Sequence, residues 1–201
     1  MKIIIYITVF VLMALSCRAQ VIQDTTNETI VPLEQQTDDL LILQRPYYLE
    51  DVNNVLDKFI GTWTGAYNNL NYTFIISDKD ILSINGVRRD ILRMRFKITD
   101  TSGNILEDTT NLPDDSPYTS FGKYIDTSGQ SYHLTYIGQR SDCGHGGEFI
   151  ISVGHNNNPN LMQLYIVVRG ESFNAERCPD YANHPVLLPK HTDPQALFTK
   201  Q

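Results

Sequence analysis

The sequence has few cysteines, few basic residues and a single tryptophan among its 201 residues. Three cysteines are too few for a small domain held together by several disulfides. The 16 lysines and arginines against 23 aspartates and glutamates give a formal charge of −7, which argues against the basic surface that nucleic-acid binding requires. The hydrophobic content of 41% is that of a folded chain, so extensive disorder is excluded as well.

Motifs that carry common enzyme chemistry are also missing. The sequence contains no phosphate-binding glycine loop, no nucleophile elbow, no zinc-binding helix motif and no calcium-binding loop. Two acidic pairs, Glu107-Asp108 and Asp114-Asp115, are interpreted as turn residues, because short acidic side chains bond their own backbone in turns. We therefore expect no catalytic residue, no metal ligand and no cofactor-binding residue.

The first 19 residues have the pattern of an export signal. Lys2 precedes an apolar run over residues 3–15, which is shorter than the roughly 20 residues that a membrane-spanning helix needs. Two processing routes remain open: cleavage after Ala19, or a lipoprotein-like box over residues 14–17 in which Cys17 is lipidated. The protein is predicted to be secreted or to lie in the cell envelope, with membrane contact only through a lipid anchor at Cys17.

After removal of the signal, Cys143 and Cys178 remain, and in an oxidising compartment an even pair predicts a disulfide. Three alternatives use the same residues. The two thiols stay free and half-buried, or Cys143 acts as a nucleophile with His145 as its base. In the third, Cys143, His145, Cys178 and His184 bind a metal ion, although their spacing differs from the usual zinc pattern.

The rest of the chain predicts an all-β domain. Residues 20–46 are polar and read as a flexible tether, and apolar spacing over 49–58 predicts one short helix. From residue 59 to 170 the apolar residues alternate with polar ones, as in 92–98 and 131–136, and turn residues separate eight or nine such runs. An antiparallel meander of this length hides its edges by closing into a barrel over residues 47–178. Residues 179–201 are expected to pack on it as an extended arm.

Gly61-Thr62-Trp63 resembles the Gly-x-Trp motif that opens the lipocalin and calycin barrels, in which the indole closes one barrel end. This resemblance implies a stacking cation, for which Arg169 is the candidate. The chain also resembles an uncharacterised family of small exported proteins from flavobacteria and other Bacteroidetes, through SCRAQ at 16–20, DVNNVLDK at 51–58, ILEDTTNLPDDSPY at 105–118 and CGHGG at 143–147. That family has no known function, so it implies no catalytic residues.

These observations favour a non-enzymatic binding or interaction module of the cell envelope. The lipocalin-like barrel suggests a small hydrophobic ligand. The alternative is a structural or inhibitory envelope protein that contacts a protein partner through surface loops, notably residues 111–118.

Overall fold

The computed structural model describes residues 28–36, 46–84, 86–141, 143–168, 176, 178–180, 183–192 and 195–201. The predicted signal at 1–19, the candidate lipidation site Cys17 and the candidate stacking residue Arg169 lie outside these residues. Within them, no helix has the length and apolar character needed to cross a membrane.

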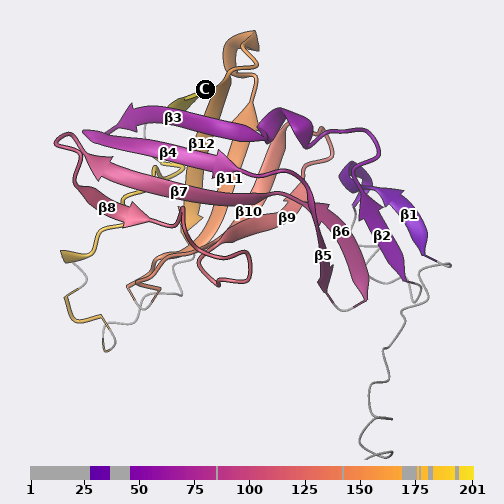
Figure 1. Ribbon diagram of the computed structural model, residues 1–201, viewed down its shortest axis with the longest axis horizontal. Coiled ribbons are helices and arrows are strands. Elements are labelled where there is room, and N and C mark those ends of the chain that lie inside the picture. Colours follow the sequence, from indigo (N-terminus) through magenta and orange to yellow (C-terminus); the bar gives the residue numbers. More distant parts are fainter. Residues whose placement is uncertain are drawn as a thin grey trace, which may run out of the picture.

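Eight antiparallel strands form a closed barrel, which confirms the all-β, lipocalin-like prediction. β4 pairs with β3 on one side and with β7 on the other, so the ring has no free edge there (Figure 1). A ninth strand, β8, extends from β7. The strands are β3 (Gly61–Tyr67), β4 (Leu70–Ile76), β7 (Arg93–Asp100), β8 (Ile105–Asp108), β9 (Ser120–Ile125), β10 (Ser131–Ile137), β11 (Gly146–Val153), β12 (Leu161–Val168) and β13 (Leu197–Lys200).

The barrel includes a strand from the predicted C-terminal arm. β13 lies between β12 and β3 and pairs with both. Without it, β12 and β3 would each expose an unpaired edge, so the strand completes the ring. Residue 178 is therefore not the end of the barrel domain, and the arm contributes a structural strand as well as a surface segment.

A small second sheet stands beside the barrel, at the right of Figure 1. Its strand order is β1-β2-β6-β5, with β1, β2 and β6 parallel. Because β1 and the turn that follows it lie within residues 28–36, and Leu33 there is buried, this part of the predicted tether belongs to the folded domain. The strands are β1 (Thr29–Pro32), β2 (Tyr47–Glu50), β5 (Asp80–Ile84) and β6 (Val87–Ile91).

The helix predicted over 49–58 was wrong. The segment begins as β2, continues through turns and ends in a single 3-10 turn, Asp57–Phe59. The Asp51 carboxylate accepts hydrogen bonds from the backbone N–H groups of Val55 (2.7 Å) and Leu56 (3.2 Å), and Asn54 has a positive φ of 54°. These local bonds hold the backbone in turns, in the way that Asp and Asn side chains compete with helices.

Aromatic side chains fill the barrel interior. Neighbouring ring centroids lie 4.9 Å apart for Phe74 and Phe198, and 5.1 Å apart for Tyr136 and Phe149. Such edge-to-face contacts add to the hydrophobic stabilisation of the core. The largest buried rings are those of Phe59, Trp63, Tyr72, Phe74, Phe96, Tyr132, Tyr136, Phe149 and Phe198.

Trp63 lies near the start of β3, at one end of the barrel. Its indole is fully buried, and Nε1 donates a hydrogen bond to the Phe59 carbonyl at 2.9 Å. The cation near its ring is Lys200 of β13, with Nζ 5.3 Å from the centroid. Gly61 is required here, because its φ is 133° and a Cβ would lie 2.8 Å from the Lys200 side chain. We call the group Leu56, Phe59, Trp63 and Lys200 the closed end.

Candidate functional site

The candidate site lies at the other end of the barrel. β10 begins near the closed end, where Tyr132 contacts Phe59, and ends at Ile137 beside a surface pocket of about 290 Å³. We call this the mouth pocket. It lies among β8, the loop that follows β10 and the C-terminal arm, and it is lined by Leu106, Glu107, Gln139, Arg140, His145, Asn183, His184, Pro185 and Leu187.

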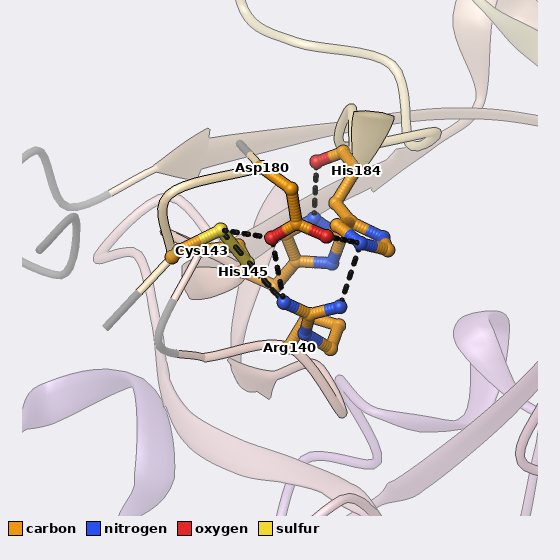
Figure 2. The surroundings of a disulfide bond; sticks show 6 residues. Arg140, Cys143, His145, Asp180 and His184 are labelled. Carbon is orange, nitrogen blue, oxygen red and sulfur yellow. Dashed lines mark hydrogen bonds and ion pairs between the residues drawn. A yellow bond between two sulfur atoms is a disulfide. The ribbon is translucent and has the colours of Figure 1, made fainter. Parts of the chain in front are cut away.

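A disulfide ties two of these elements together. Cys143 of the loop is bonded to Cys178 of the arm, as the sequence predicted. Figure 2 shows the Arg140 side chain beside this bond, pointing toward Asp180 and His184. Arg140 donates to the Cys143 sulfur at 2.9 Å and lies 3.5 Å from the Asp180 carboxylate. The disulfide and the guanidinium together hold the arm over this end of the barrel.

The two histidines of the pocket hold the arm as well. His145 Nε2 lies 3.0 Å from the His184 carbonyl, so this nitrogen is a donor. His184 Nε2 lies 2.8 Å from the Asp180 carboxylate and 2.7 Å from Arg140. The hydrogen bond to His184 is the main reason that the pKa of Asp180 lies below its usual range. This network joins the arm to the loop after β10 at the rim of the pocket.

Glu107 brings a carboxyl group to the inner side of the pocket. It lies on β8 opposite Ile98 of β7, and cross-strand partners point to the same face, so Glu107 faces the barrel interior with the buried Ile98. Among the described residues, no hydrogen bond or ion pair involves its carboxylate. Burial alone raises the pKa of Glu107 to about 7. The turn interpretation of the acidic pair is therefore wrong for Glu107.

The Tyr136 hydroxyl is a second polar group without a partner. The residue is 2% exposed, and its hydroxyl has no hydrogen-bond partner in the described part of the chain. Burial raises the pKa of Tyr136, and the nearby charge of Glu107 raises it further. The hydroxyl lies 2.8 Å from the point that a Cβ on Gly138 would occupy, and His145 Nδ1 lies 3.3 Å from that point. Tyr136 is thus placed directly behind His145.

The other residues considered for catalysis or metal binding are engaged in structural bonds. Each sulfur of Cys143 and Cys178 is bonded to the other, so neither is a thiolate that can attack a substrate or bind a metal. The Asp180 carboxylate lies close to both sulfurs, but its hydrogen bonds go to the rim network. Asp108 behaves as a turn acid, because it accepts from the Thr110 backbone N–H, whereas the Asp114 carboxylate pairs with Arg95 of β7 at 2.5 Å.

His145 and His184 were named from the sequence only in the alternative catalytic and metal interpretations, and neither Glu107 nor Tyr136 was identified as a residue of a site. The alternation of Tyr132, Leu134 and Tyr136 was the available signal for Tyr136, because it predicts three side chains on one face. The inward direction of Glu107 depends on the pairing of β8 with β7. That pairing contains a register shift between Ile98 and Thr99, which the sequence does not reveal.

Comparison with known proteins gives a family but no activity. No curated protein matches the chain, and no solved structure matches it. Residues 1–137 match a family described as a family of unknown function, DUF6705. The match covers β1 to β10, and so includes Trp63, Glu107 and Tyr136. Since it extends over more than half of the sequence, the chain belongs to the DUF6705 family of unknown function.

Proposed function

We propose that this protein is a non-enzymatic binding module of the cell envelope that takes a small ligand in the mouth pocket. The observation that carries the proposal is the half-buried Glu107 carboxylate, which lines an open pocket and has no hydrogen-bond partner among the described residues. Buried polar groups are normally hydrogen-bonded, and a ligand would supply the missing partner. The envelope location rests on the signal-like pattern of residues 1–19.

The position of the ligand differs from that in a hollow barrel. Rings such as Phe96, Phe149 and Phe198 occupy the interior, and a hydrophobic ligand there would have to displace them. Interiors packed in this way resist such changes in volume. The mouth pocket needs no displacement. Leu106, Pro185 and Leu187 give it apolar walls for the body of a ligand.

A binding role also agrees with how the reactive side chains are used. His145 donates its Nε2 proton to a backbone carbonyl, and His184 is held between Asp180 and Arg140. These residues fasten the arm. A nucleophile with an adjacent base is the arrangement expected of a hydrolase, and the two sulfurs are joined in the disulfide. We therefore assign the network a structural role in shaping the pocket.

Ligand-observed NMR with a library of small organic compounds tests the proposal on the full chain. Leu187→Trp should fill the pocket and abolish the binding that the wild-type protein shows. Val167→Trp is the matched control, because Val167 is an exposed residue of β12 outside the pocket and its replacement should leave binding unchanged. Equal binding to both variants, or no binding to the wild-type protein, would contradict the proposal.

A second candidate function is docking of a protein partner through the loop 111–118. The observation in its favour is that the loop is firmly held: Arg93 donates to the Asp114 carbonyl and Arg95 to the Leu112 carbonyl, at 2.9 and 2.8 Å. A preorganised loop loses little conformational entropy on binding. Cross-linking in an envelope extract, with Asp115→Lys as the variant, tests it. A specific partner that the variant fails to recover would support docking, and recovery of the same proteins by both would exclude it.

A further inference from the structure

The electrostatic environment of the Glu107 carboxyl group distinguishes the mouth pocket. The carboxyl group lies in an apolar setting, facing the interior with Ile98. Asp108 follows Glu107 on β8 and pairs with Lys97 of β7. Because successive side chains of a strand point to opposite faces, Asp108 and Lys97 lie on the outer face, away from Glu107. From these strands, Glu107 receives no compensating positive charge.

The described residues of the other elements around the pocket do not supply one either. The end of β10 brings Tyr136, the loop after it brings Arg140 and His145, and the arm brings His184 with its partner Asp180. Arg140 is directed to Asp180, His184 and the Cys143 sulfur, and His145 donates to a carbonyl. In agreement with this, burial is the only cause that shifts the pKa of Glu107. An ionised Glu107 is therefore a partly buried anion without a counter-ion among the described residues.

We propose that the mouth pocket binds a small organic cation, a primary ammonium group on a short apolar body, with the ammonium at the Glu107 carboxylate. This inference rests on the proposed function, that the pocket takes a ligand. Leu106, Pro185 and Leu187 face the apolar body.

The chemistry of the pocket favours a cation over an anion or a neutral donor. A hydrogen bond between an ammonium and a carboxylate is roughly twice as strong as one between neutral groups. An anion would lie near the Glu107 carboxylate and would need Arg140, which already pairs with Asp180. The volume of about 290 Å³ lies at the lower end of the range for ligand pockets, so the body of the ligand is short.

The proposal includes a defined pH dependence. Only the ionised carboxylate attracts the ammonium, and the pKa of Glu107 is about 7. At pH 5 about 1% of the groups are ionised, so the apparent affinity should fall to that of the uncharged pocket, about 10-fold below its value at pH 8. An alkylammonium stays protonated throughout this range. Affinity should therefore rise with pH through 7 and then level off.

The experiment compares three probes of equal length, n-butylammonium, n-butanol and butyrate, by NMR titration of the full chain at pH 8. Wild-type protein should bind butylammonium about 10-fold more tightly than butanol. Glu107→Gln should lose this advantage and keep its affinity for butanol. Glu50→Gln is the matched control, because Glu50 lies on β2 in the small sheet and should change neither value.

The outcomes separate the ligand class from the existence of the site. Equal affinities for butylammonium and butanol, or an advantage that survives in Glu107→Gln, would overturn the cation assignment while the pocket still binds ligands. Tighter binding of butyrate would overturn it in favour of recognition by Arg140. Titrations that leave the amide signals of residues 106–107 and 183–187 unchanged for every probe would contradict both the ligand class and the proposed function.

Discussion

The two ends of the barrel differ in whether the polar groups beside them have hydrogen-bond partners. At the closed end, the Trp63 nitrogen donates to Phe59, and the Tyr132 hydroxyl accepts from the Leu92 N–H at 3.0 Å. At the mouth, the Tyr136 hydroxyl and the Glu107 carboxylate have no such partners among the described residues. One end is arranged for stability, and the other keeps bonding capacity that stability does not use.

The largest expected effect is at the closed end. Trp63→Ala removes the buried indole and its hydrogen bond, and should lower the free energy of unfolding by ~3–5 kcal/mol. Urea unfolding followed by circular dichroism measures this. In the unmodified protein the single tryptophan should show a blue-shifted, quencher-protected emission. A loss below 1 kcal/mol, or emission at the water-exposed wavelength, would remove Trp63 from the core of the closed end.

Removal of the disulfide should have the second-largest effect on stability, and the loss of protection should be greatest at the mouth. Replacing both Cys143 and Cys178 by Ala should cost ~2–4 kcal/mol of stability, because the bond restricts the unfolded chain. Hydrogen exchange should rise first in residues 183–192, which lose their attachment to the loop. The closed end should keep its protection. Equal acceleration at both ends would show that the arm is not held locally.

Glu107 should give the mouth a pH dependence that the closed end lacks. Its pKa is about 7 in the folded protein and near 4.3 in an unfolded chain, so between these values only the folded state holds the proton. The free energy of unfolding should therefore fall as the pH rises from about 4.5 to 7, by on the order of 2 kcal/mol. Urea unfolding at pH 5 and pH 8 should show this fall in the wild-type protein and a smaller fall in Glu107→Gln. Identical falls would mean that Glu107 ionises freely.

The smallest expected effect tests the cation at the closed end. Lys200→Met keeps most of the apolar stem but removes the charge over the Trp63 ring, and should cost ~0.5–2 kcal/mol. Chemical denaturation measures it, with Lys97→Met on the outer face of β7 as the control. A cost no greater than that of the control would indicate that Lys200 contributes through its position in β13 alone.

The sequence predicts the closed end better than the mouth, for a physical reason. Alternation in segments such as 92–98 reports which side chains face inward, and Gly61 with Trp63 marks the first barrel strand. Both signals are local. The helix predicted over 49–58 failed because apolar spacing did not include the hydrogen bonds of Asp51 to nearby backbone N–H groups.

The mouth depends on contacts between distant segments. Glu107 faces inward because β8 pairs with β7 in a shifted register, and the pocket exists because the arm returns over the loop after β10. Neither fact follows from the residues near Glu107 in the chain. Only the Cys143–Cys178 pairing could be predicted from the sequence, because removal of the predicted signal leaves two cysteines and a single connectivity.

The position of β13 has a consequence for biogenesis. The strand is separated from its neighbour β3 by most of the domain, yet the ring closes only when residues 197–200 enter between β12 and β3. During synthesis, the preceding strands emerge before β13. Until β13 pairs with them, β12 and β3 each have an unpaired edge, and such edges favour pairing with other chains. Closure over so long a loop is also slow. The barrel therefore closes only after residues 197–200 have paired with both β12 and β3.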